Sequence, residues 1–331
     1  MYHSIWKNSH YEAGLRYGKS LFKKGINPIS ARSITKLQKE FSAACLPFYI
    51  KYYPEITEEI QGIADGLNID FSSIADFLFT MYCFTYENNC SCFAFSKGNK
   101  TILARNSDFL SNIRKLCDSA YYNLKDGYRF IGNTTSWTEI EDGINIHGLA
   151  AGLTFIYPVK IKPGINAGLM IRYILEKCKN VNEAVAAAKS LPISSQHTIM
   201  LADKSGKTAL LECCCDKVNV IYPKEKTYLF TTNHFNSPEM LAYQYKGTDD
   251  IHSHERYKTI KEAFEKEFEP SVKFSADLLS GKYGFMCQYN RKNGMDTIWA
   301  SVFDVTDLKI YRAEGNPSRK GFIADKRLFK L

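Results

Sequence analysis

The chain contains 331 residues, of which 45% are apolar and 24% are charged, and its formal net charge is +8. This balance is typical of a globular protein, and it excludes disorder, collagen and coiled coil as the dominant state. The longest apolar stretch, at 77–84, is far shorter than the ~18 residues of a membrane helix, and the first residues lack the basic-then-apolar pattern of a signal peptide. We therefore expect a cytoplasmic protein that does not contact membranes.

The distribution of lysines and cysteines argues against two further classes of partner. The lysines are scattered, without a long run of like charges, which favours a solvated surface over a nucleic-acid-binding stripe. Ten cysteines are many for a cytosolic chain, yet no CxxC pair occurs, and the three at 213–215 would alternate between the two faces of a strand. We therefore expect no metal and no cofactor, with most cysteines as buried thiols.

The first quarter of the chain has helical periodicity. Apolar residues recur at helical spacing, and Gly25, Pro54, Gly66 and Asp70 stand where helices would begin or end. The helices predicted in this region are 13–25, about 29–53, 54–66 and 70–86.

At Cys90 the apolar period changes from helical to two. Residues 90–96 and 100–105 flank a turn at 97–99, which predicts a β-hairpin. Strands and helices then follow in groups, so we predict an α+β fold with antiparallel sheets, and no GxGxxG motif supports a dinucleotide site. The later predicted strands are 120–133, 144–156, 197–203, 208–215, 218–222, 228–232, 297–304 and 309–312, and the later predicted helices are 167–178, 181–191, 253–268 and 276–279.

Register arithmetic within this hairpin brings a thiol close to charged residues. Paired positions sum to about 196 or 197, which puts Cys90 opposite Asn106 or Ser107. Arg105 and Asp108 fall beside that point, and a guanidinium next to a thiol stabilises the thiolate. On spacing alone an alternative stays open, in which Arg105 and Asp108 form a structural ion pair and Cys90 is a bystander.

The segments NCSCF at 89–93 and ARNSDF at 104–109 resemble the nucleophile segment of the acyl-coenzyme A:6-aminopenicillanic acid acyltransferase family, and more distantly that of choloylglycine hydrolases and penicillin V acylases. One such motif is weak evidence, whereas an ordered set is specific. The resemblance implies an N-terminal nucleophile (Ntn) hydrolase with an αββα four-layer sandwich. The further segments that carry it, in order, are GLAAGLTF at 148–155, LADKSG at 201–206 followed by Glu212, TTNHF at 231–235, SHER at 253–256 and GNP at 315–317.

The resemblance also implies self-processing. Cleavage between Asn89 and Cys90 would divide the chain into a helical leader, residues 1–89, and a catalytic domain, residues 90–331, so that the intact chain is a zymogen. The freed α-amino group of Cys90, with an unperturbed pKa of about 7.7–8, would accept the thiol proton before Cys90 attacks an amide or thioester carbonyl. Water or a second amine would then release the acyl group.

Further roles follow from the resemblance. Asp108 would hydrogen-bond the amino group or the thiol, and Arg105 would hold that carboxylate and lower the pKa of the thiol. Asn233 would donate its side-chain N–H to the oxyanion, with a backbone N–H near Thr154 as the second donor.

Several positions also have a simpler interpretation. Arg256 would be a substrate-side or structural cation at a helix start, or else a surface ion-pair residue, and Asn233 would otherwise cap a turn. His234 is interpreted as structural and not as a base, and Cys92 as a core residue and not as the nucleophile.

The chain departs from the family pattern at two places. Asn89 stands where the family commonly has Gly, the residue that reaches strained turns most easily; Asn is the next most tolerant, so cleavage would be slower. Thr154 and Phe155, at the expected substrate and oxyanion position, replace the Asn and Tyr of bile-salt hydrolases. Those enzymes also lack an 89-residue leader, so the acyltransferase branch is favoured.

We therefore expect an enzyme that hydrolyses a linear amide or transfers an acyl group, with a small-molecule amide or acyl donor as its substrate, acting as a monomer or a homo-oligomer. Two hypotheses from other classes stay open. One is an uncleaved, catalytically silent family member that acts as a binding protein. The other is a thiol-redox or metal-handling protein that uses the cysteine-rich stretches.

Overall fold

The computed structural model describes residues 1–26, 33–84, 89–224, 227–247 and 252–330. The helices are α1 (His10–Lys23), α2 (Lys36–Tyr52), α3 (Pro54–Leu67), α4 (Phe71–Thr80), α5 (Ala167–Lys177), α6 (Val181–Ser190), α7 (Ser253–Glu265), α8 (Val272–Leu279) and α9 (Arg327–Lys330). The strands are β1 (Ile5–Asn8), β2 (Asn89–Lys97), β3 (Lys100–Leu110), β4 (Asp118–Leu124), β5 (Phe130–Thr134), β6 (Asp142–Asn145), β7 (Leu149–Phe155), β8 (His197–Asp203), β9 (Thr208–Cys214), β10 (Lys217–Ile221), β11 (Tyr228–Thr231), β12 (Met295–Asp304), β13 (Lys309–Ala313) and β14 (Ile323–Asp325).

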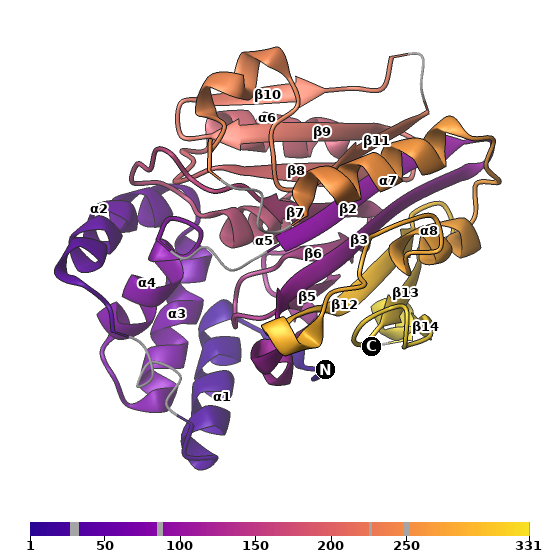
Figure 1. The fold of residues 1–331 in the computed structure, drawn as a ribbon. Helices are drawn as coiled ribbons and strands as arrows, with labels where there is room; N and C mark the ends of the chain where they lie inside the picture. The colour runs from indigo at the N-terminus through magenta and orange to yellow at the C-terminus, as the bar shows by residue number, and fades with distance from the viewer. Residues whose placement is uncertain (27–32, 85–88, 225–226, 248–251, 331) are drawn as a thin grey trace.

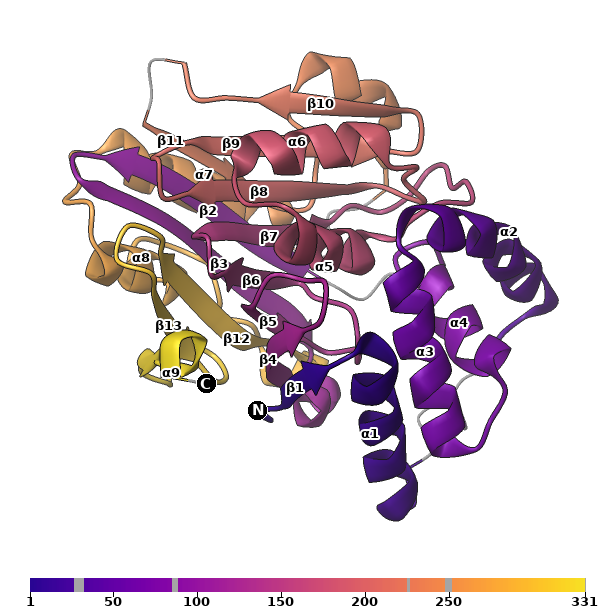
Figure 2. The same ribbon diagram turned by 180° about the vertical axis from the view of Figure 1, so that it is seen from behind.

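These elements form a four-layer α-β-β-α sandwich. The strands of the described residues make an eight-stranded sheet, in the order β1-β4-β5-β6-β7-β8-β9-β10, and a six-stranded sheet, in the order β11-β2-β3-β12-β13-β14. One apolar core, which includes Cys92, Leu103 and Met200, lies between the two sheets. Helices α7 and α8 cover the outer face of the smaller sheet (Figure 1), and α5 and α6 cover the outer face of the larger one (Figure 2). The predicted fold class is confirmed.

The leader packs at one side of the sandwich (Figures 1 and 2). Its helices α1 and α3 approach so closely that a Cβ added at Gly14 would lie 2.0 Å from the carbonyl oxygen of Glu59. A capping box between Ser9 and Glu12 starts α1, and Pro54 occupies the first turn of α3. The leader was predicted to be purely helical. It also contains β1, which pairs in parallel with β4 as an edge strand of the larger sheet.

The hairpin of β2 and β3 positions the candidate site. Cys90 pairs with Ser107, one of the two partners predicted from the register. Because side chains alternate along a strand, Cys90 and Cys92 both face the other sheet, and so do Arg105 and Ser107 on the neighbouring strand. Cys90, near the start of β2, therefore faces the space between the two sheets.

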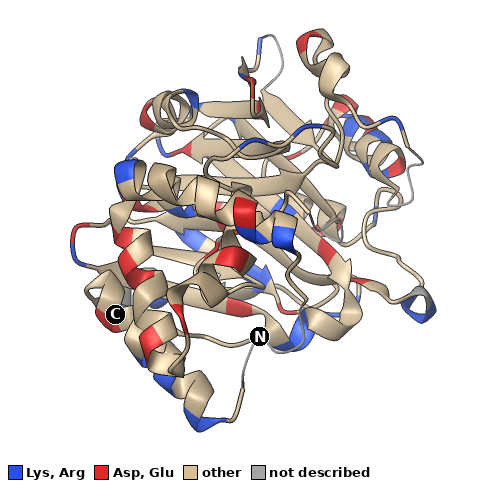
Figure 3. Cartoon of the chain, turned by 90° about the vertical axis from the view of Figure 1, so that its left-hand side faces the viewer, with Lys and Arg blue, Asp and Glu red and all other residues tan. Residues whose placement is uncertain are grey.

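Most of the predicted elements are present, with three kinds of difference. The segments 120–133 and 144–156 are each two strands joined by a turn, and β1, β14 and α9 were not predicted. The predicted helices 29–53 and 70–86 were also too long, because α2 begins at Lys36 and α4 ends at Thr80, and residues 33–35 and 81–84 are not helical; the parts of these predictions at 29–32 and 85–86 lie outside the described residues. None of the described helices combines the length and the apolar composition that a membrane crossing requires, and acidic and basic residues are interspersed on the face shown in Figure 3.

Candidate active site

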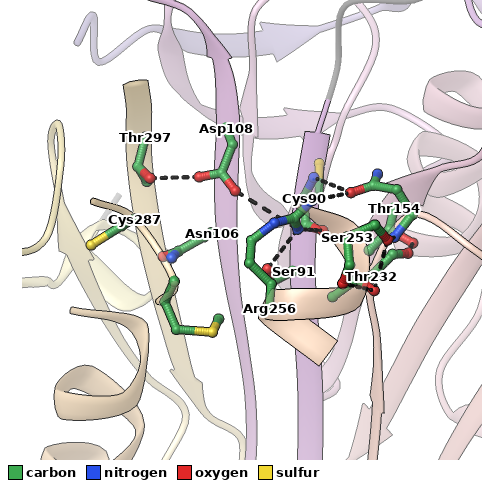
Figure 4. A network of polar contacts seen from close by, with 12 residues as sticks. Cys90, Ser91, Asn106, Asp108, Thr154, Thr232, Ser253, Arg256, Cys287 and Thr297 are labelled. Carbon is green, nitrogen blue, oxygen red and sulfur yellow. Dashed lines mark hydrogen bonds and ion pairs between the residues drawn. The ribbon is translucent and has the colours of Figure 1, made fainter. Parts of the chain in front are cut away.

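Cys90 is the second residue of β2, and its side chain is fully buried. Nη2 of Arg105 donates to the Cys90 sulfur over 2.7 Å, from the neighbouring strand of the same sheet. The backbone N–H of Cys90 donates to Oδ1 of Asn233 over 3.1 Å, and Arg256 donates to its carbonyl oxygen over 2.5 Å. Figure 4 shows Arg256 reaching from helix α7 to the end of β2. The thiol, the N–H and the carbonyl of one residue are thus each held by a different side chain.

Burial dominates the protonation state of this thiol in the uncleaved chain. It raises the pKa of Cys90 to about 12, and the charges of Glu141 and Asp108 add to the rise, while Arg105 lowers it by a smaller amount. The expectation of a stabilised thiolate is therefore wrong for the uncleaved chain, although the guanidinium acts in the predicted direction. A neutral, buried thiol is a weak nucleophile.

Arg105 is held by carboxylates other than the one expected. Its Nη1 donates to Asp142 over 2.8 Å, its Nη2 to Glu141 over 3.0 Å, and its Nε to the carbonyl oxygen of Leu153 over 2.7 Å. Asp108 lies on the opposite face of β3, since it is three positions along the strand from Arg105. Both the expected hold of Arg105 on Asp108 and the alternative of a structural ion pair between them are wrong.

Asp108 instead faces helices α7 and α8, directly across the hairpin from Asn89. It accepts hydrogen bonds from the hydroxyls of Thr297 (2.5 Å) and Tyr289 (3.0 Å), and Nη1 of Arg256 lies 3.9 Å away. Burial raises the pKa of Asp108 to about 6, against the opposing effect of Arg256. A carboxyl group with that pKa exchanges protons near neutral pH, and Asp108 lies beside Asn89, the residue before Cys90.

Asn233 follows β11 and bridges the two sheets. Its Oδ1 accepts the N–H of Cys90 and Nη2 of Arg256 (2.7 Å), and its Nδ2 donates to the carbonyl oxygen of Phe155 over 2.7 Å. Its own backbone N–H donates to Oγ of Ser253 over 2.8 Å. An amide nitrogen carries two hydrogens, so Nδ2 retains one for a further acceptor.

The two β7 residues of the expected oxyanion region lie on opposite faces of their strand. Oγ1 of Thr154 lies between the sheets, 2.6 Å from Oγ1 of Thr198 and 2.6 Å from the carbonyl oxygen of Thr232. The ring of Phe155 points the other way and packs on Tyr82 of the leader, with 6.2 Å between centroids. Only the backbone of Phe155 reaches toward Asn233.

Arg256 is fully buried, so its interpretation as a surface ion-pair residue is wrong. It lies in the first turn of α7 and donates to Ser91 Oγ over 2.8 Å in addition to its contacts with Cys90 and Asn233. His234 is buried, with Nδ1 2.7 Å from Oγ of Ser253. Cys92 lies in the core between the sheets, on the same face as Cys90.

Several residues of this network were not predicted. Glu141 and Asp142 were missed, although an acidic cluster in an otherwise apolar stretch was a usable signal. Ser253 entered only as the first residue of the SHER segment, without a role, and Thr297 and Tyr289 gave no signal in the sequence. Among the described residues, no group of three or more His, Cys, Asp or Glu side chains is arranged to hold a metal ion. All ten cysteines are free thiols.

Comparisons with known proteins bear on this arrangement. A family described as acyl-coenzyme A:6-aminopenicillanic acid acyl-transferase matches residues 95–319, a span that begins after Cys90. A mutant of the conjugated bile acid hydrolase from Clostridium perfringens superimposes with a TM-score of 0.53 at 14% identity, over 71% of this chain and 92% of that chain. Penicillin V acylase from Agrobacterium tumefaciens gives a TM-score of 0.48 at 17% identity, over 68% and 82%. No protein of curated function matches the sequence. The bile acid hydrolase likeness identifies the sandwich as an Ntn-hydrolase fold.

Proposed function

The chain belongs to the acyl-coenzyme A:6-aminopenicillanic acid acyl-transferase family, and from that premise we propose that it is a self-cleaving enzyme that hydrolyses linear amides or transfers acyl groups through Cys90. The observation that carries the proposal is the convergence of three side chains on Cys90. Arg105 contacts its sulfur, Asn233 its N–H and Arg256 its carbonyl. A core cysteine needs partners for its buried N–H and carbonyl, but it needs no guanidinium at its sulfur, because an uncharged thiol packs as a small apolar group.

The first proposed reaction is cleavage of the chain itself. The Cys90 thiol gives up its proton and the sulfur attacks the carbonyl carbon of Asn89; the C–N bond between the two residues breaks, and the nitrogen takes up a proton. Water then hydrolyses the thioester, which leaves a carboxylate on Asn89 and a free thiol and α-amine on Cys90. Asp108 pairs with Asn89, and its pKa of about 6 suits a group that carries protons near neutrality.

The second proposed reaction is turnover. The α-amine of Cys90 accepts the thiol proton, the sulfur attacks a substrate carbonyl, and the leaving amine departs with a proton. The hydrogen that Nδ2 of Asn233 retains is donated to the oxyanion, together with a backbone N–H near Thr154, and one such donor contributes ~10²–10³-fold in rate. Water or a second amine then attacks the thioester and restores the thiol.

The burial of the Cys90 thiol is consistent with a zymogen. Cys90 is fully buried and its pKa is raised to about 12, so the uncleaved chain holds its nucleophile neutral and away from solvent. The same observation favours the second candidate, a silent family member that stays whole and acts as a binding protein. The two candidates differ in whether the bond before Cys90 breaks.

Intact-mass measurement of the purified chain incubated at neutral pH tests the proposal. We expect two fragments, residues 1–89 and 90–331, and a single full-length species for Cys90→Ala. Cys92→Ala is the matched control, since that thiol is also buried on the same face of β2, and it should cleave normally. Cleavage that persists in Cys90→Ala would reveal an outside protease and contradict the proposal, and a wild type that stays whole would favour the silent candidate.

A further inference from the structure

Two residues in the first turn of helix α7 hydrogen-bond to Asn233. Nη2 of Arg256 donates to the side-chain Oδ1 of Asn233 over 2.7 Å. Ser253, three residues earlier on the same helical face, accepts the backbone N–H of Asn233 on its Oγ over 2.8 Å. Figure 4 shows Ser253 and Arg256 on the same short stretch of ribbon. One rigid turn therefore fixes both the backbone and the side chain of the proposed oxyanion donor.

The neighbours of the Ser253 hydroxyl determine which hydrogen bonds it donates and accepts. Its Oγ lies 2.8 Å from the nitrogen of Asn233, 2.7 Å from Nδ1 of His234 and 3.0 Å from Oγ1 of Thr232. Oγ1 of Thr232 in turn donates to the carbonyl oxygen of Ser253 over 3.1 Å. A hydroxyl donates once and accepts twice, so these three contacts are satisfied together when Ser253 donates to Thr232 and accepts from Asn233 and His234.

This arrangement leaves Ser253 no chemical role of its own. Its hydrogen and both lone pairs are engaged, its side chain is buried, and it belongs to a helix and not to a loop. It also assigns His234 the tautomer with hydrogen on Nδ1, which makes that imidazole a donor to Ser253 and removes this nitrogen as a base. What the hydroxyl supplies is a fixed position for the segment 232–234.

We propose that Ser253 is a positioning residue that holds Asn233 in line for the oxyanion, with His234 and Thr232 fixing the direction of its hydroxyl. The inference rests on the proposed function, because it acts only through Asn233. An oxyanion donor works only at hydrogen-bonding distance from the position that the developing charge will occupy. Loss of the bond to the Asn233 N–H lets that segment shift, which lowers the rate of the chemical step without removing any group that touches substrate.

A double-mutant cycle on the mature enzyme tests this role, with p-nitrophenyl acetate as the probe. We expect Ser253→Ala to lower kcat about tenfold with KM unchanged. In the Asn233→Ala background the same substitution should have no further effect, since residues that act as a unit are not additive. Ser253→Thr, which keeps the hydroxyl, should recover most of the loss.

Ser275→Ala is the matched control. Ser275 is also a buried helical serine, but its hydroxyl bonds to the carbonyl oxygen of Ser271 in the neighbouring turn and, among the described residues, to no part of the site, so kcat should stay at the wild-type value. An equal loss from Ser253→Ala with and without Asn233, or a folded Ser253→Thr as slow as Ser253→Ala, overturns the positioning role. Probe turnover that survives in Cys90→Ala overturns the proposed function instead, so the two failures are distinguishable.

Discussion

Two buried arginines, Arg105 and Arg172, contact the same kinds of group but lie in different regions of the molecule. Both are fully buried, and each bonds two carboxylates: Arg105 contacts Glu141 and Asp142, and Arg172 contacts Glu59 (2.8 Å) and Glu176 (2.6 Å). Each also donates to a backbone carbonyl and faces an aromatic ring, Trp299 at 5.7 Å for Arg105 and Tyr122 at 3.7 Å for Arg172. Burial lowers the pKa of each guanidinium, yet nearby anionic partners raise it above the usual range.

The two clusters differ in what completes them. Arg105 contacts a thiol, and the partners described above for it all lie in the sandwich, after residue 89. Arg172, on α5, is joined by residues of the leader: Glu59 on α3, and His10 and Tyr53, which bond to its neighbour Glu176. The same set of groups therefore clamps the N-terminal helices to the sandwich in one place and holds the candidate nucleophile in the other. Buried ion pairs alone do not reveal function; the reactive group beside them does.

The largest effect that separates the two clusters is expected from Arg172→Met. It leaves Glu59 and Glu176 as buried carboxylates without their guanidinium, which costs about 3–5 kcal/mol of stability. Urea unfolding of the uncleaved chain should report this loss, while kcat per folded molecule stays near wild type. A variant that keeps its stability but loses turnover would mean that Arg172 belongs to the catalytic network, and the comparison would fail.

A second prediction applies one substitution to both arginines. Arg105→Lys keeps the charge but cannot reproduce the planar fork of donors that reaches Cys90, Glu141 and Asp142 together. We expect kcat to fall ~10²–10³-fold, the size associated with a lost transition-state donor. Steady-state turnover and the rate of self-cleavage would be measured for both variants. Arg172→Lys is the matched control; equal losses of kcat in the two would show that the assay follows folding and not chemistry.

The sequence was informative where structure is determined locally. The turn at Gly98, which has a φ of +60°, fixes the register of the hairpin within one residue of the prediction. The opposite faces of Arg105 and Asp108 were also implied, since a spacing of three along a strand separates side chains, and this signal was overlooked. Strand β1 was missed because its four residues are mostly exposed and pair with β4, more than a hundred positions away.

The contacts of the site join residues that are far apart in the sequence, so no local sequence pattern predicts them. Glu141 and Asp142 meet Arg105 only because the two sheets face each other at that point. The pKa of Cys90 follows from complete burial, which exceeds the effect of the neighbouring guanidinium predicted from the spacing. Likewise, the resemblance indicated Asn233 and Arg256, but their convergence on one residue is a property of the assembled sandwich.

The smallest expected effect concerns the pH dependence of the leader clamp. Burial alone would lower the pKa of His10, but Glu176 and Glu59 raise it above the ordinary value of 6.5. A group with a raised pKa in the folded state binds a proton more tightly there than in the unfolded chain, so its stabilisation is complete below pH 6.5 and is lost as the pH rises through the folded pKa. One proton limits the slope to about 1.36 kcal/mol per pH unit.

Urea unfolding at successive pH values above 6.5 would measure that alkaline decline, and His10→Gln should flatten it, because glutamine keeps a donor for Glu176 but does not titrate. His197→Met is the control. Burial lowers the pKa of His197 to about 3, so this histidine is neutral in both the folded and the unfolded chain well above pH 6.5, and its loss should leave the decline unchanged. If the decline persists in His10→Gln, the proton is held elsewhere.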